Sequence, residues 1–170
     1  MLTSARPLGV ALVALSLSLC LCLVPLAANA GIGVRGGVQV RGKLGTTGVA
    51  GGHIDASLFP LLRVRPNVEV GKKGSQTLIN PSVDIHLKLN PTGIGPRPYI
   101  GGGVGVQTVR TKVTVLGVTT TKTANDPSYN VLGGIDIPVA PFVRLFVEGK
   151  GVFVEGKRTF RLLGGLTLSM

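Results

Sequence analysis

The alternation of apolar and polar side chains along the chain is the feature that most constrains its fold. Between residues 62 and 70, aliphatic residues and a proline alternate with Arg63, Arg65, Asn67 and Glu69. Successive side chains of a β-strand point to opposite faces, so a period of two predicts strands and excludes helices. The four consecutive segments with this pattern are 32–41, 50–58, 62–70 and 79–89.

The second half of the chain is richer in glycine but keeps the same period. Ile100, Val104 and Val106 oppose Gln107 and a series of glycines. The segments predicted as strands are 98 to about 108, 129–139, 142–154 and about 158–170. Lengths of roughly 9–13 residues suit tilted strands that cross a bilayer. We therefore predict an all-β fold, an eight-stranded antiparallel up-and-down transmembrane β-barrel.

The mean hydropathy of +0.44 is high for a water-soluble protein. Beyond the first thirty residues no apolar run approaches the length of a membrane helix. A chain of this kind must distribute its apolar residues by alternation, as transmembrane barrels do with their lipid-facing and lumen-facing side chains.

The first thirty residues have the organisation of a cleavable signal peptide. Arg6 precedes an apolar run, and the small-residue pattern Ala28-Asn29-Ala30 follows it. We expect cleavage before Gly31, so that residues 1–30 are the signal and 31–170 the barrel domain. Both cysteines fall in the signal, at positions 20 and 22. The exported chain is thus expected to have no disulfide, no thiol catalysis and no cysteine metal site.

The formal net charge of +11 raises the question of nucleic acid as a partner. The basic residues are scattered singly along the predicted strands, without a patch or an aromatic RNA-binding motif, and the chain is predicted to be exported. Nucleic acid is therefore not an expected partner. The expected partner is outer-membrane lipid.

The predicted connections alternate between segments rich in Pro and Gly and segments that mostly contain Lys. With the N-terminus on the periplasmic side, segments 59–61, 90–97 and 138–141 become periplasmic turns rich in Pro and Gly. The expected external loops are 43–47, 71–76, 109–128 and 155–157. Only residues 109–128 form a long loop, which is the candidate site for an extracellular ligand. Near Val109 the apolar residues change from even to odd positions and so from one face of the strand to the other. This change predicts a bulge or the point where the chain leaves the bilayer.

Charged residues gather on the face that we expect to point into the barrel. An eight-stranded barrel is filled by its own side chains, and charges inside it need partners. We predict a lumenal network in which Asp55 pairs with arginines of the first and third strands, and Glu148 with Arg144 or Arg161. The network is expected to comprise Arg35, Arg41, Asp55, Arg63, Arg65, Glu69, Asp84, Lys88, Arg144, Glu148, Lys150 and Arg161, with Asp136 on the same face.

One His-x-Asp and one Asp-x-His arrangement on this face are candidate metal sites. His53 with Asp55, and His86 with Asp84, carry ligand types that zinc accepts, but an intervening strand separates the two pairs. Ser57, considered as a nucleophile, lies too far along its strand from His53 for direct contact. We therefore assign no metal, no cofactor and no catalytic residue, and expect that the protein is not an enzyme.

Three motifs in succession resemble a known family. PYIGGGVGV at 98–106, GGIDIP at 133–138 and LFVEGK at 145–150 are similar to segments of the outer-membrane β-barrel domain family, the small opacity-type barrels of Gram-negative bacteria. The resemblance implies residence in the outer membrane and no particular reaction. It implies insertion by the barrel-assembly machinery, for which the apolar C-terminal end is a signal. It also implies aromatic girdles, for which the available residues are Tyr99, Tyr129, Phe59, Phe142, Phe146, Phe153 and Phe160.

Three functions remain open from the sequence. The preferred one is an integral outer-membrane barrel with a structural or surface-interaction role and a lumen filled by salt bridges. The alternatives are a narrow anion-preferring pore and a soluble periplasmic ligand-binding β-barrel. The soluble barrel requires apolar side chains inside and charges outside, whereas both membrane readings require the reverse.

Overall fold

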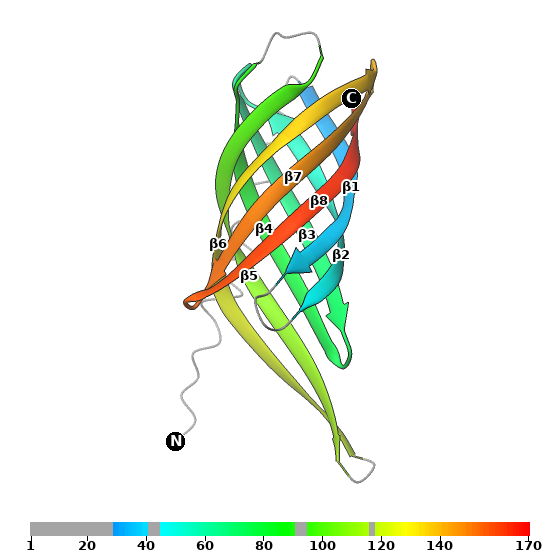
Figure 1. Cartoon of the computed structure of the whole chain (residues 1–170), viewed down its shortest axis with the longest axis vertical. Helices are drawn as coiled ribbons and strands as arrows, with labels where there is room; N and C mark the ends of the chain where they lie inside the picture. The colour runs from blue at the N-terminus through cyan, green and yellow to red at the C-terminus, as the bar shows by residue number, and fades with distance from the viewer. Residues whose placement is uncertain (1–28, 41–44, 91–94, 116–117) are drawn as a thin grey trace.

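The fold is a closed barrel of eight antiparallel strands in sequence order (Figure 1). The computed structural model describes residues 29–40, 45–90, 95–115 and 118–170. No helix in these ranges is long and apolar enough to span a membrane. The strands are β1 (Asn29–Val40), β2 (Thr46–Ser57), β3 (Leu62–Lys73), β4 (Gln76–Lys88), β5 (Arg97–Val115), β6 (Val118–Ala140), β7 (Val143–Val154) and β8 (Lys157–Ser169).

The pairing of β1 with β8 closes the sheet. It runs from Gly31↔Ser169 to Val40↔Phe160. The backbone N–H of Met170 adds a hydrogen bond of 2.8 Å to the carbonyl of Ala30. Closure leaves no unpaired edge within the barrel wall, and the predicted fold class is confirmed.

The alternation seen in the sequence becomes an alternation of environment. Arg63 and Glu69 on β3 point into the barrel and are 0% exposed. Val68, which points outward from the same strand, is 45% exposed. Outward aliphatic residues of the other strands behave like Val68, for example Val34 at 59% and Val147 at 53%. The described part of the barrel is thus polar inside and apolar outside.

The expected long loop at 109–128 is instead a β-hairpin, so the predicted ends of strands five and six were wrong. β5 and β6 stay in continuous register from Arg97↔Asp136 to Val115↔Val118, which also shows that the bulge expected near Val109 does not form. Outside the apolar belt both faces of a strand meet water. The Thr- and Val-rich sequence can therefore continue the β-pairing although its apolar residues no longer stay on one face of the strand.

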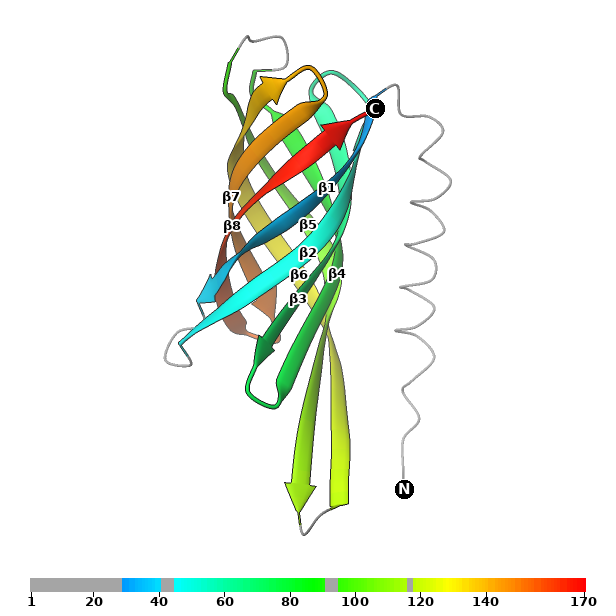
Figure 2. The same ribbon diagram turned by 90° about the vertical axis from the view of Figure 1, so that its right-hand side faces the viewer.

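This hairpin projects beyond the rest of the barrel (Figures 1 and 2). Pairing of β5 with β4 ends at Gln76↔Thr111. Pairing of β6 with β7 begins only at Ser128↔Val154. Beyond these points β5 and β6 pair with each other alone. The start of β1 and the C-terminus lie together at the end opposite the hairpin (Figure 1).

Several other connections are shorter than predicted. Only Glu155 and Gly156 separate β7 from β8, with φ of 43° and 73°, as a type I′ hairpin turn requires. β3 continues to Lys73 and leaves a two-residue turn before β4. The segment 138–141 is only partly a turn, because β6 reaches Ala140 after a register irregularity that begins at Pro138.

β1 begins at Asn29, two residues before the expected cleavage point. Residues 1–28, which hold nearly all of the predicted signal peptide, lie outside the described residues. Arg41, one of the predicted network residues, also lies outside them. The division into residues 1–30 and 31–170 stays a prediction.

Candidate functional site in the barrel lumen

The charged side chains of the inner face meet in the lumen and form one connected set of ion pairs. The strands position them by alternation, since the charged residues and the outward-facing residues, most of them aliphatic, follow one another along each strand. Those that are fully buried, at 0% exposure, are Arg63, Arg65, Glu69, Asp84, Glu148, Lys150 and Arg161.

Glu69 on β3 is one centre of the network. Arg35 Nη1 donates to Glu69 Oε1 over 2.8 Å, and Lys150 Nζ lies 3.4 Å from the same oxygen. Arg161 Nη1 donates to Glu69 Oε2. One carboxylate is therefore contacted by cations from β1, β8 and β7, which lie two, three and four strands away around the barrel.

Asp55 on β2 is a second centre, closer to the end of the barrel opposite the hairpin, where β1 begins and the 58–61 connection lies; we call this the turn end. Arg65 binds it with two nitrogens, Nε to Oδ1 at 2.6 Å and Nη2 to Oδ2 at 3.2 Å. Arg63 Nη1 and Arg144 Nη2 each lie 3.2 Å from Oδ2. Asp136 shares this cluster, because Arg63 Nη1 also donates to its Oδ2 over 2.7 Å.

Glu148 on β7 joins the two centres. Its Oε1 lies 3.4 Å from Arg35 Nη1, and its Oε2 lies 3.2 Å from Arg65 Nη1. The hydroxyl of Tyr99 donates to Oε2 over 2.9 Å. Strands β3 and β7 lie four positions apart in either direction around the barrel. The Arg65–Glu148 ion pair therefore spans the lumen from wall to wall.

Asp84 on β4 accepts three donors. Lys150 Nζ, Asn67 Nδ2 and Asn130 Nδ2 each lie 2.9 Å from one of its oxygens. Lys150 thus links Asp84 to Glu69, again across the lumen from β7 to the β3–β4 wall. Hydrogen bonds to several donors offset the cost of burying the carboxylate.

The predicted partners of the acidic residues were only partly right. Asp55 pairs with Arg63 and Arg65 of the third strand, as expected, but Arg35 of the first strand pairs with Glu69 and Glu148 instead.

Glu148 pairs with neither Arg144 nor Arg161. Arg144 lies near the turn end, where it contacts Asp55 and Asp136, and Arg161 contacts Glu69. The cations that contact Glu148 come instead from β1 and β3, as Arg35 and Arg65. Lys88, half-buried at the turn end, donates to the hydroxyl of Ser57 over 3.0 Å.

Tyr99 and Phe146 lie in the lumen and cannot contribute to an aromatic girdle. They are 1% and 2% exposed. The guanidinium carbons of Arg63 and Arg65 lie 5.0 Å from the Tyr99 ring centre and 4.9 Å from the Phe146 ring centre, respectively. A cation over an aromatic face is stabilised when both are desolvated. Tyr99 was not among the predicted lumenal residues. Its position was nevertheless predictable, because Tyr99 alternates with outward residues in the same way as the inward glycines at 101, 103 and 105.

The two histidines take part in packing and hydrogen bonding. His86 stacks on Tyr99 at 4.7 Å, and its Nδ1 lies 3.1 Å from Arg63 Nη2. His53 Nε2 lies 2.9 Å from the hydroxyl of Thr167. In the described ranges no three His, Cys, Asp or Glu side chains are arranged to hold a metal ion.

Neither Ser57 nor Ser82, the inward serines nearest to the histidines in sequence, forms a hydrogen bond with a histidine in the described lumen. Ser82 donates to Asn67 Oδ1 over 3.0 Å, and Ser57 accepts from Lys88. The lumenal site is therefore arranged for charge neutralisation, with no pairing of nucleophile and base among these residues.

Inward glycines create the space that the large side chains occupy. A Cβ on Gly134 would lie 2.6 Å from the Tyr99 ring and from the Val147 carbonyl oxygen, whereas one on outward Gly133 would meet nothing closer than 3.8 Å.

We expect Gly134→Ala to lower the free energy of unfolding by about 1–3 kcal/mol, the usual cost of overpacking. Gly133→Ala, the adjacent control, should be close to neutral. Urea unfolding of the detergent-folded protein measures both, and equal effects at the two positions would contradict the packing of Tyr99 described above.

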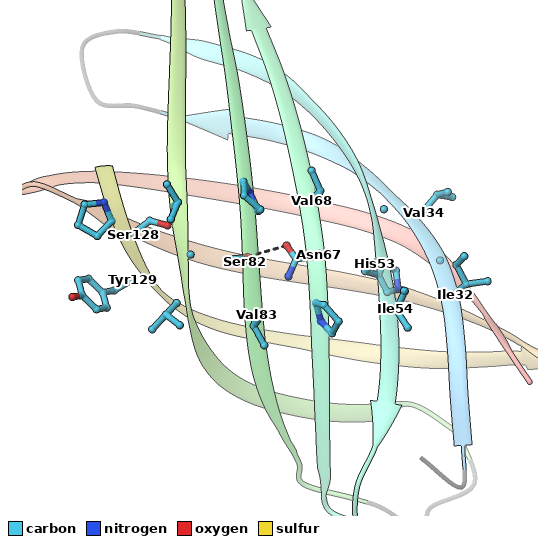
Figure 3. A pocket seen from close by; sticks show the side chains of 18 of the residues that line it. Ile32, Val34, His53, Ile54, Asn67, Val68, Ser82, Val83, Ser128 and Tyr129 are labelled. Carbon is cyan, nitrogen blue, oxygen red and sulfur yellow. Dashed lines mark hydrogen bonds between the residues drawn. The ribbon is translucent and has the colours of Figure 1, made fainter. Parts of the chain in front are cut away.

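The outer wall contrasts with the lumen along the same strands (Figure 3). Ile54, Val68 and Val83 line a stretch of apolar outer surface that crosses β2, β3 and β4. Asn67 and Ser82, which alternate with them, form the hydrogen bond drawn in the same view.

Comparisons with solved structures identify this architecture. The N-terminal β-barrel domain of Pseudomonas aeruginosa OprF superposes with a TM-score of 0.67 at 14% identity, covering 85% of this chain and 98% of that domain. Neisserial surface protein A gives 0.64 at 15% identity, with 82% and 95% covered. The attachment invasion locus protein Ail of Yersinia pestis gives 0.57 at 9% identity, with 84% and 97% covered. A further structure of Ail contains the heparin analogue sucrose octasulfate.

No protein-family model and no curated protein sequence matches the chain. The likeness therefore lies in the fold. The chain is an eight-stranded barrel of the outer-membrane type, similar to these three proteins, and its lumen holds a buried salt-bridge network.

Proposed function

We propose that this chain is an integral protein of the bacterial outer membrane with a structural and surface-interaction role, without enzymatic activity and without an open pore. The observation that carries the proposal is the inverted distribution of polarity. Charges fill the described lumen, and aliphatic side chains cover the outer wall. In hydrocarbon this arrangement is favourable, because a closed barrel satisfies its backbone hydrogen bonds internally and presents only apolar side chains to lipid.

The soluble ligand-binding barrel is contradicted by the same observation. It requires an apolar interior, but the positions that face inward hold fully buried arginines and carboxylates. A water-soluble protein that exposed so many aliphatic residues over its whole wall would associate or aggregate.

Cell fractionation combined with a heat-modifiability gel tests the membrane location. We expect the protein in the outer-membrane fraction, with a shift in gel mobility between unheated and boiled samples. Recovery in the soluble periplasmic fraction without such a shift would contradict the proposal.

The ion pairs between β3 and β7 argue against the pore. Arg65–Glu148 and Lys150–Glu69 cross the lumen between opposite walls, and all four side chains are fully buried. We expect planar bilayers with the purified protein to show no steady conductance. Stable, anion-selective channel steps would instead support the narrow pore.

The β5–β6 hairpin is the surface for an interaction outside the membrane. It extends beyond the barrel, and Arg110 and Lys122 are exposed on it. Ail, a barrel of the same fold, has been crystallised with a sulfated heparin analogue. Deletion of residues 110–122, which removes both cations, should leave heat modifiability intact and abolish retention of the folded protein on immobilised heparin at low salt. Unchanged retention would exclude the hairpin as the binding surface.

Export and insertion follow the sequence signals. We propose that residues 1–30 are removed on secretion and that the assembly machinery recognises the C-terminal end, where Leu166 and Leu168 of β8 and the following Met170 are exposed on the outside. The intact mass of the purified membrane protein should correspond to a chain that begins at Gly31. A mass that includes the first thirty residues would contradict cleavage.

A further inference from the structure

The outer face of the described strands carries no acidic residue. The chain has seven Asp and Glu residues in total. Glu155 lies in the β7–β8 turn, and Asp126 pairs with buried Gln107 and so has inward parity. The other five are in the lumenal network, namely Asp55, Glu69, Asp84, Asp136 and Glu148.

Basic residues do occur on the outer face, and those with described side chains all lie at the hairpin end. Lys72 has the parity of outward Val68 and Val70, and Arg110 pairs with Thr77 in the same outward row. Arg158 pairs with outward Phe153.

The outward positions at the opposite end of the barrel are apolar. The exposed large apolar residues described there include Phe59, Leu61, Leu89, Val139, Phe142 and Met170, and the exposed smaller ones are prolines and Ala140. The two ends of the wall therefore differ in charge. The described outer face of the turn end carries only aliphatic and aromatic side chains. The outer face of the hairpin end also carries basic side chains, and no acidic side chain accompanies them there.

Lys72, Thr77 and Arg110 form one row across β3, β4 and β5. The register pairs Lys72 with Thr77 and Thr77 with Arg110. Adjacent strands lie about 4.8 Å apart, so the Cα atoms of Lys72 and Arg110 are roughly 10 Å apart with a hydroxyl between them. Side chains of this length can converge on one phosphate group, for which guanidinium and ammonium groups are the usual ligands.

Aromatic residues mark where this end of the wall meets the membrane surface. Tyr129 pairs with Phe153, which in turn pairs with Arg158, and all three are exposed on the outside. Exposed aromatic residues of a transmembrane barrel lie at the headgroup level. The cations thus lie at or beyond the level of the lipid headgroups.

We propose that the Lys72–Thr77–Arg110 row binds the phosphate of a phosphorylated lipid headgroup in the leaflet on the hairpin side of the membrane. Arg158 supplies a second cation on the other side of the wall. The proposal rests on the membrane location proposed above. A lipid, rather than free phosphate, is the ligand because the row directly continues the apolar wall. Acyl chains can pack against that wall while the headgroup reaches the cations.

The test compares a charge-removing variant with a matched control in vesicles. The full-length exported chain, Lys72→Gln/Arg110→Gln, and the control Lys122→Gln/Lys157→Gln are folded into phosphatidylcholine vesicles. The control removes two charges at the same end from residues of inward parity. The vesicles contain either an acylated disaccharide glycolipid with two phosphate monoesters or its dephosphorylated form. The glycolipid that copurifies with the protein in mild detergent is quantified per mole of protein.

We expect the unaltered protein and the control to retain the phosphorylated glycolipid, and Lys72→Gln/Arg110→Gln to retain about tenfold less. Equal retention by the two variants, equal retention of the dephosphorylated glycolipid, or full displacement by inorganic phosphate would each overturn the assignment. Heat modifiability of every sample separates this failure from failure of the proposed function. If the unaltered chain does not fold in any vesicle, both the membrane location and the lipid site are contradicted.

Discussion

Replacing Glu69 with alanine should lower the free energy of unfolding by about 3–5 kcal/mol, since the substitution removes the partner of buried cations. Lys150 would keep Asp84, and Arg35 would keep Glu148. Arg161 would keep only the uncharged Gln39 and Asn80. Guanidinium chloride or urea unfolding in detergent micelles measures the loss.

Glu155→Ala is the matched control, because it removes the same side chain from an exposed turn. It should change stability by less than about 0.5 kcal/mol. The double variant Glu69→Ala/Arg161→Met should recover part of the loss, because it also removes the cation left without an ionic partner. If Glu69→Ala were as stable as Glu155→Ala, the lumenal network would not stabilise the barrel.

A cation on the outer wall should be costly only if that wall faces hydrocarbon. Val147 lies near the middle of β7 and is 53% exposed. Val147→Arg should cost about 2–4 kcal/mol in a bilayer, the range for a basic residue at the bilayer midplane. Phe142→Arg, at the turn end of the same wall, should cost about 0–1 kcal/mol because it lies near the interface.

Reversible unfolding in lipid vesicles checks this difference. A soluble barrel would tolerate arginine at an exposed valine with little change, so equal and small effects at both positions would contradict a lipid-facing wall.

The sequence was sufficient to predict the architecture because alternation is a local property. Arg63, Arg65, Asn67 and Glu69 have a common parity, and no knowledge of the closed barrel is needed to place them on one face. The number of strands followed from the turns. The ends of β5 and β6 did not, because apolar parity marks only the part of a strand inside the apolar belt. The hairpin continues beyond that part.

The partners within the lumen could not be predicted from the sequence. Which residues of opposite walls meet depends on strand tilt and register, and these are fixed only when β1 pairs with β8. Glu148 illustrates the difficulty, since its sequence neighbours suggested Arg144 or Arg161 while Arg35 and Arg65 reach it across the lumen. Tyr99 could have been placed by parity, but its aromatic ring suggested the membrane interface instead.

The orientation of the wall toward lipid is the central claim, and a single tryptophan tests it most directly. The chain contains no Trp, so the Val147→Trp and Lys122→Trp variants each carry one reporter. In vesicles of lipids brominated at mid-chain, Val147→Trp should show blue-shifted emission that the bromines quench strongly. Lys122→Trp, on the projecting hairpin, should be quenched by aqueous iodide instead. Iodide quenching of Val147→Trp without quenching by the brominated lipids would contradict the account.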